Sequence, residues 1–137
     1  MSDHGTRFSW DGHATWYQVV GALDGASSKT PVVICHGGPG AAHDYVEPIA
    51  DLSRFGRTCV LYDQLGCGKS EHLPDAPADF WNPRLFKDEL TALTSHLGIN
   101  ERHAVVGQSW GGMSCALRRS RCGCEAISTS NSPVTSA

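Results

Sequence analysis

The sequence lacks the long apolar run of a membrane protein and the basic face of a nucleic-acid-binding protein. Nowhere do about 18 consecutive apolar residues occur, and no apolar segment follows the polar N-terminus Met1-Ser2-Asp3-His4-Gly5. Its 11 Lys and Arg are outnumbered by 14 Asp and Glu, and they are scattered along the chain apart from Arg118, Arg119 and Arg121, which we expect at the solvated end of a helix. These absences argue against a membrane or nucleic-acid partner and predict a cytoplasmic protein.

The sequence also lacks the spacing of a metal site. Three of its six cysteines lie in or beside apolar runs, where cysteine usually behaves as a small buried hydrophobe, and we expect them reduced: Cys35, Cys59 and Cys67. The other three cluster near the end without a neighbouring histidine: Cys115, Cys122 and Cys124. Zinc sites need a different pattern of ligands, so no metal is predicted.

What is present is an alternation of strand-like and helix-like segments. Residues 8–10 and 15–20, joined by Asp11-Gly12-His13, predict an antiparallel hairpin. The later apolar runs predict strands covered on both faces, with helices between them that imply a parallel sheet. The expected strands are 31–35, 58–62, 103–106 and 126–129, and the expected helices are 44–54, one from Pro83 to Gly98 and one after the strand 103–106.

The helix after Asn82-Pro83 has the clearest signal, with an N-cap, a proline at the first position and Gly98 at the end. Its apolar residues step by four, three and four and form one stripe that should pack on the sheet: Phe86, Leu90, Leu93 and Leu97. Charged residues are expected off that stripe: Lys87, Asp88 and Glu89. Four histidines are expected at the surface or in loops: His43, His72, His96 and His103.

The stretch Gly107-Gln108-Ser109-Trp110-Gly111-Gly112 puts a serine in a G-x-S-x-G frame directly after a strand. A serine in such a turn is held in strained backbone with its hydroxyl exposed above the sheet, so Ser109 is the candidate nucleophile. An ordinary glycine and serine turn is the alternative, because the pattern alone is short.

Two further glycine loops follow strands, His36-Gly37-Gly38-Pro39-Gly40 and Gly66-Cys67-Gly68. Ligands of parallel sheets gather at the carboxyl ends of the strands, so all three loops should converge on one site. Acyl transfer by Ser109 needs donors for the oxyanion, and the backbone N–H groups of Trp110 and Gly38 are the candidates.

Other interpretations of these loops are weaker. A phosphate-cradling loop is possible for HGGPG, but no Gly-x-Gly-x-x-Gly register is present. Gly68-Lys69-Ser70 imitates the tail of a Walker A motif, yet Asp63 stands where the first glycine must be. His36 is expected to hold loop backbone by hydrogen bonds, with a role as general base the less favoured alternative.

The motifs HGGPG at 36–40, DQLGCGKS at 63–70 and GQSWGG at 107–112 together resemble the proline iminopeptidase family of α/β-hydrolases. The resemblance covers nearly the whole chain, and Asp63-Gln64-Leu65 is similar to a subgroup that includes amino-acid amidases. It implies release of N-terminal residues from peptides, or hydrolysis of amino-acid amides, by Ser109 without a cofactor. The loops that would support the site comprise His36, Gly37, Pro39, Gly40, Asp63, Gln64, Gly66, Gly68, Gly107, Gln108, Gly111 and Gly112.

The acid and the base of a catalytic triad are missing from the sequence, because no Asp or His follows Ser109. The resemblance therefore implies that these residues form the N-terminal portion of an α/β-hydrolase fold, without the cap domain and the C-terminal half. We expect this portion to be inactive by itself. We divide this incomplete domain into a hairpin and loop at 1–30, core strands and helices with the nucleophile turn at 31–113, and an atypical tail at 114–137. The alternatives are a non-catalytic α/β binding module or a decayed remnant, and a nucleotide-binding domain.

Overall fold

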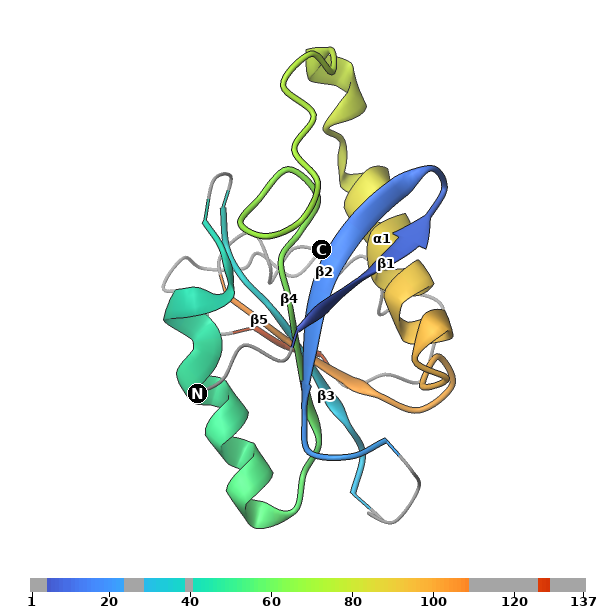
Figure 1. Ribbon diagram of the computed structural model, residues 1–137. Helices are drawn as coiled ribbons and strands as arrows, with labels where there is room; N and C mark the ends of the chain where they lie inside the picture. Colours follow the sequence, from blue (N-terminus) through green and yellow to red (C-terminus); the bar gives the residue numbers. More distant parts are fainter. Residues whose placement is uncertain (1–4, 24–28, 39–40, 109–125, 129–137) are drawn as a thin grey trace.

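The computed structural model of the chain describes residues 5–23, 29–38, 41–108 and 126–128. They form a six-stranded mixed sheet in the order β1-β2-β4-β3-β5-β6 (Figure 1). The strands are β1 Thr6–Trp10, β2 His13–Val20, β3 Val32–Cys35, β4 Cys59–Tyr62, β5 Ala104–Gly107 and β6 Ala126–Ser128. Pairs β1–β2 and β2–β4 are antiparallel, whereas β3–β4, β3–β5 and β5–β6 are parallel. The predicted sheet, mostly parallel with an N-terminal hairpin, is confirmed.

The hairpin turn is tighter than predicted. Asp11 and Gly12 both adopt positive φ, 45° and 78°, and β2 already begins at His13. A two-residue turn with positive φ at both central residues matches the right-handed twist of the flanking strands. Asp11 and Gly12 therefore make up the whole turn, and His13 belongs to the strand.

Helices cover both faces of the sheet (Figure 1). The 3-10 helix η1, His43–Phe55, buries Val46 and Ala50 against one face, and the α-helix α1, Pro83–His96, buries Leu90 and Leu93 against the other. Alternate residues of one strand pack against η1 on one face and against α1 on the other, because successive side chains of a strand point to opposite faces. A short 3-10 turn, η2 Ala78–Phe80, lies within the predicted loop before α1.

The helix predicted over 44–54 is present, but it is a 3-10 helix. Pro48 lies inside it, where it removes a backbone donor, and Gly56 ends it at a φ of 79° with its N–H bonded to the Ser53 carbonyl. The predicted caps of α1 are confirmed: the Asn82 side chain accepts from the Leu85 N–H at 3.0 Å, and Pro83 is the first residue.

Glu89 contradicts the prediction that it lies off the apolar stripe, because it is fully buried. Its Oε1 accepts the Thr15 hydroxyl at 2.7 Å and the Leu65 N–H at 2.8 Å. The Trp10 indole N–H in turn donates to Thr15 Oγ1 at 2.8 Å. One carboxyl oxygen thus joins α1, β2 and the loop after β4.

Helical geometry explains the burial of Glu89. It lies three residues after Phe86 and four before Leu93, and both spacings place side chains on one helix face. Its Oε2 has no hydrogen-bond partner among the described residues. Burial raises the pKa of Glu89 to about 8, against a smaller lowering by its hydrogen bonds to Thr15 and Leu65. The carboxyl is therefore protonated at neutral pH.

Two of the four histidines expected at the surface or in loops are buried: His43 lies in η1, contrary to the prediction, and His103 lies in the loop before β5 as allowed for, but is not exposed. His43 is 8% exposed, its ring stacks on Trp16 at 4.4 Å, and its Nδ1 lies 2.8 Å from Asp63 Oδ1. His103 is 3% exposed and its Nδ1 bonds to the Ile99 carbonyl at 2.8 Å. The His43 ring finds its partners through tertiary contacts, and the His103 ring finds its partner in the turn that precedes it. The other two, His72 and His96, are exposed as predicted.

The loop after β4 is built around the buried carboxylate of Asp63. Its Oδ1 accepts the His43 N–H at 2.8 Å and its Oδ2 accepts the Lys69 N–H at 2.9 Å. Gly68 has a φ of +50°, and a Cβ there would lie 2.4 Å from Asp63 Oδ2. Only glycine fits this position without displacing the carboxylate.

The three cysteines predicted to be reduced form no disulfide with any described residue, with Cys35 and Cys59 buried and Cys67 half-buried. In the described part of the chain, no helix is long and apolar enough to cross a bilayer.

We predict that Glu89→Gln removes a pH dependence of stability. Glu89 has a folded pKa of about 8 against an ordinary value of 4.5, so folding takes up a proton between these pH values. The contribution of this proton uptake to the free energy of unfolding is fully present below pH 4.5. It is lost as pH rises towards 8, by up to roughly 1.4 kcal/mol per pH unit. Urea unfolding at several pH values should show that the free energy of unfolding falls with rising pH in the wild type and stays nearly constant in Glu89→Gln.

Asp88→Asn is the matched control, because the Asp88 side chain is 60% exposed and pairs only loosely with Arg84 at 4.0 Å. Asp88→Asn should leave the dependence of the free energy of unfolding on pH as it is in the wild type. Parallel stability curves for wild type and Glu89→Gln would show that the buried carboxyl does not bind a proton on folding.

A second prediction concerns Gly68→Ala, with Gly56→Ala as control. Both positions have positive φ, and both substitutions should cost about 1 kcal/mol in backbone strain. Only Gly68→Ala also meets atoms, Asp63 Oδ2 at 2.4 Å and Ala42 Cβ at 2.9 Å, so it should cost about 1–3 kcal/mol more. Thermal or urea unfolding measures the difference, and equal losses would contradict the proposed fit.

Candidate active site

Parallel pairing of β3 with β4 and β5 brings the predicted glycine loops to one edge of the sheet. Ile34 pairs with Leu61 and Cys35 with Gly107, so the chain leaves all three strands at a similar level. The Gln108 N–H donates to the Cys35 carbonyl at 3.3 Å, which places the start of the serine turn beside the HGGPG loop. The loops after β3 and β4 contact each other directly.

That contact is a pair of hydrogen bonds that Gln64 donates to His36, and both residues are buried. The Gln64 backbone N–H donates to His36 Nε2 at 2.9 Å, and the Gln64 side-chain amide donates to the His36 carbonyl at 2.7 Å. Since Nε2 accepts, the ring proton is on Nδ1, which donates to the Gly37 carbonyl at 2.5 Å. Burial lowers the pKa of His36, so the ring is neutral as this arrangement requires.

The His36 ring thereby sets the orientation of the next peptide group. A trans peptide is planar, so fixing the Gly37 carbonyl also fixes the Gly38 N–H, which lies in the same plane and points in the opposite direction. The Gly37 N–H is already used, because it donates to the Tyr45 hydroxyl. No acceptor for the Gly38 N–H is found among the described residues. The Gly38 N–H is thus held in one orientation, and its role as an oxyanion donor stays a prediction.

Asp63 and Ser70 fasten the second loop to β2. The Asp63 N–H donates to the Trp16 carbonyl at 3.1 Å, and the Ser70 hydroxyl donates to the Asp63 carbonyl at 2.5 Å. The Trp16 N–H donates to Ser70 Oγ at 2.8 Å. Gly66, at a φ of +83°, leaves room for Trp81, whose Cη2 would lie 2.7 Å from a Cβ there. Asp63, Gln64, Gly66 and Gly68 are therefore structural supports of the edge.

Lys69 is placed unlike a Walker A lysine. Its Nζ lies 4.9 Å from the centre of the Trp16 ring, a cation–π contact, and its backbone N–H serves Asp63. The Walker A interpretation therefore has no support in the geometry of this loop.

Several predicted site residues lie outside the described residues: Pro39, Gly40, Ser109, Trp110, Gly111 and Gly112. The predicted helix after the serine turn, Cys115, Cys122 and Cys124 lie there too. Gly107 is buried at the end of β5 and Gln108 is half-buried beside it, which places the start of the turn at the predicted edge. The last predicted strand is found at Ala126–Ser128, pairing with β5.

Sequence reasoning missed Tyr45 and Ser70. Ser70 could have been noticed as the last residue of the DQLGCGKS motif, where a small hydroxyl can bond loop backbone. Tyr45 belongs to no motif, and its bond to Gly37 depends on how η1 packs beside the glycine loop.

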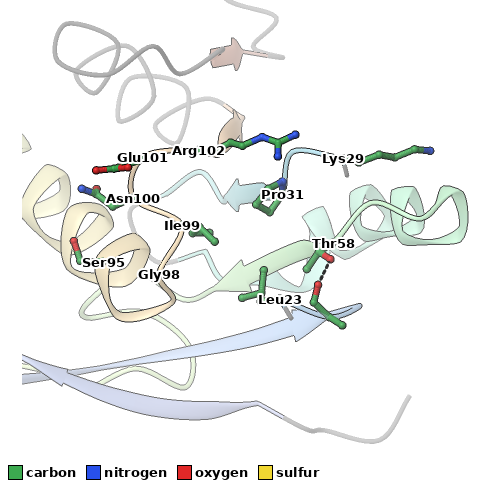
Figure 2. A pocket seen from close by; sticks show the side chains of 11 residues that line it. Leu23, Lys29, Pro31, Thr58, Ser95, Gly98, Ile99, Asn100, Glu101 and Arg102 are labelled. Atoms are coloured by element: carbon green, nitrogen blue, oxygen red, sulfur yellow. Dashed lines mark hydrogen bonds between the residues drawn. The ribbon is translucent and has the colours of Figure 1, made fainter. Parts of the chain in front are cut away.

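A cavity of about 570 Å³ opens at the opposite edge of the sheet (Figure 2). Pro31 and Thr58, which precede β3 and β4, line it together with Ile99 and Arg102. Thr58 closes one side by donating to the Ala22 carbonyl at 2.6 Å. No predicted site residue lines this cavity, so it is separate from the candidate site. Within the described ranges, no group of three or more His, Cys, Asp or Glu could hold a metal ion.

Comparison with known proteins agrees with this arrangement. The family model for the alpha/beta hydrolase fold matches residues 30–117. The proline iminopeptidase of Clostridium botulinum is 46% identical over 101 residues, which cover 74% of this chain and 33% of the relative. That of Lactiplantibacillus plantarum is 47% identical over 105 residues, 76% of this chain and 35% of the relative. The chain thus spans about a third of the length of these curated relatives.

Solved structures show the same likeness. The proline iminopeptidase of Mycobacterium smegmatis superposes with a TM-score of 0.77 at 50% identity, over 83% of this chain and 38% of that one. The crystal structure of VinJ gives a TM-score of 0.83 at 42% identity, over 90% and 41% of the two chains. With a family model that matches most of its length, the chain belongs to the α/β-hydrolase fold family, where it is similar to proline iminopeptidases.

Proposed function

We propose that the protein is a serine hydrolase of the proline iminopeptidase type. It would release N-terminal residues, proline or another, from peptides, or hydrolyse amino-acid amides, through an acyl-enzyme on Ser109. The observation that carries the proposal is the Gly38 peptide: its orientation is fixed by His36, and its N–H has no acceptor among the described residues at the edge where β5 ends. Similarity to proline iminopeptidases supports the choice of substrate class.

In the proposed reaction, Ser109 Oγ bonds to the carbonyl carbon of the substrate and the carbonyl oxygen takes up negative charge. The N–H groups of Gly38 and Trp110 would donate to that oxygen, which lowers the barrier most when the donors are held in place beforehand. The C–N bond then breaks, and the amine leaves with a proton. Water hydrolyses the remaining ester, which releases the acid and restores the serine.

Two groups of this scheme are assigned to no residue. No Asp or His follows Ser109 within the 137 residues, so we place neither the triad acid nor the base among them. A non-catalytic α/β binding module or a decayed remnant stays the alternative, and the labelling experiment below distinguishes it from the hydrolase. A cytoplasmic location and the division into 1–30, 31–113 and 114–137 stay predictions.

A serine-directed fluorophosphonate probe tests the proposal in the protein expressed from its own gene. We expect stoichiometric labelling at Ser109, found by peptide mass spectrometry and abolished in Ser109→Ala. Ser114→Ala, a substitution of a nearby serine outside the G-x-S-x-G frame, is the matched control and should leave labelling intact. A folded protein that takes up no probe would support the binding module instead.

The 137-residue polypeptide expressed by itself should not turn over aminoacyl amides. Without a base after Ser109 the hydroxyl is not activated, although an oxyanion hole alone can leave residual catalysis. Release of p-nitroaniline from aminoacyl anilides measures this. Turnover that disappears in Ser109→Ala would mean that a group within these residues acts as the base.

A further inference from the structure

The His36 ring is held in one protonation state by two backbone groups with opposite roles. Its Nε2 accepts the Gln64 N–H at 2.9 Å, while its Nδ1 donates to the Gly37 carbonyl at 2.5 Å. A neutral imidazole offers one acceptor and one donor, whereas an imidazolium has only donors. The hydrogen bond from Gln64 to this ring therefore exists only while the ring is neutral.

The surroundings of His36 disfavour a second proton on its ring. The residue is fully buried, and a buried cation costs free energy unless it finds partners. Asp63 in the loop after β4 and His43 in η1 are the titratable side chains found to act on the ring among the described residues. Burial is the largest influence and lowers the pKa of His36; the Gly37 carbonyl and then Asp63 oppose this lowering, and His43 adds to it. The ring is therefore charged only well below the ordinary histidine pKa of 6.5.

The two loops that this contact joins are fastened to different extents. The loop after β4 has anchors that do not involve His36: the Asp63 carboxylate accepts two backbone N–H groups, and the Leu65 N–H donates to Glu89 at 2.8 Å. The glycine loop after β3, described over residues 36–38, is bound to other segments through His36 and through one further N–H, which the Tyr45 hydroxyl accepts. Loss of the ring contact would therefore loosen the glycine loop first.

We propose that His36 is a pH-sensitive lock, which fastens the glycine loop to Gln64 while its ring is neutral and releases it in acid. A protonated ring would turn an N–H at Nε2 towards the Gln64 N–H, and two buried donors that face each other repel and lack acceptors. The ring and the glycine loop then move away from Gln64. The orientation of the Gly38 N–H depends on this ring, so it too is lost in acid. The inference goes beyond the proposed function, because it needs neither Ser109 nor a substrate.

Hydrogen exchange of two neighbouring amides tests the lock in the protein expressed from its own gene. The Gln64 N–H donates to the His36 ring and the Leu65 N–H to Glu89, so the second amide is an internal control for the first. Protection is measured by NMR from about pH 7 down to about pH 4, relative to an unstructured peptide at the same pH. Glu89 stays protonated over this range, because its pKa is about 8. Nitrogen-15 signals of the histidine rings show where each ring takes up its proton.

Protection of the Gln64 amide should be constant above pH 6.5 and should fall below it. Because opening takes up one proton, the protection should fall by up to about tenfold per pH unit. The fall should end once the His36 ring signals have titrated. Protection of the Leu65 amide should stay nearly constant, since its acceptor lies on α1 and does not move with the glycine loop.

Variants assign the effect to the ring of His36. His36→Gln supplies an uncharged amide oxygen that can accept the Gln64 N–H, so this variant should keep Gln64 protected in acid. His72→Gln is the matched control, because His72 is an exposed histidine that contacts the Gly68 carbonyl at 2.9 Å, and it should leave the fall unchanged. The two amides of the wild type decide the question even where a variant does not fold.

Three results would overturn the lock. Level protection of Gln64 in acid would show that the contact survives, and a parallel loss at Leu65 would show that the whole edge unfolds. A fall at Gln64 that follows the ring signals of His43 would assign the effect to that histidine. Absence of labelling at Ser109 would overturn the serine hydrolase and leave the lock untouched, because both amides are measured without substrate.

Discussion

The parallel pairing of β3 with β4 on one side and β5 on the other decides where the candidate site residues that the structure describes lie. The three strands are short and fully or almost fully buried, so their hydrogen bonds and apolar faces hold them in one register. Parallel strands that end at one level deliver their following loops to the same edge. A slip of one residue would move each side chain to the opposite face, against the other helix, and would offset the loops, which makes the register a constraint on stability and on the placement of the loops.

Buried polar groups then fix the loops at this edge of the sheet, and hydrogen bonds from specific partners offset the cost of burying each group. Asp63 receives backbone N–H groups from two segments, and Glu89 receives a hydroxyl and an N–H from two others. Such groups are costly when unpaired, so they allow few alternative loop conformations. The exception is Glu89 Oε2, unpartnered among the described residues, and the protonated state of this carboxyl limits its cost.

One chain of contacts connects this framework to the proposed chemistry. The Gln64 N–H fixes the tautomer of His36, the ring holds the Gly37 carbonyl, and the planar peptide presents the Gly38 N–H. Each step is short and buried, so the amide is oriented before any substrate binds. Preorganisation of this kind is what oxyanion stabilisation requires, because donors that need not reorient cost nothing when charge develops. The cavity at the opposite edge takes no part in this arrangement.

Local signals in the sequence determined the strands, the Asn82 cap, the glycines that end helices and shape turns, and the loops that meet at one edge. These depend on residues a few positions apart, which is why they could be predicted. Tertiary structure alone decided the burial of Glu89 and His43, the tautomer of His36 and the bond between Tyr45 and Gly37. Glu89 meets Thr15 from 74 positions away, and Gln64 meets His36 from 28. No local pattern carries such pairings, because they exist only once the sheet has brought the segments together.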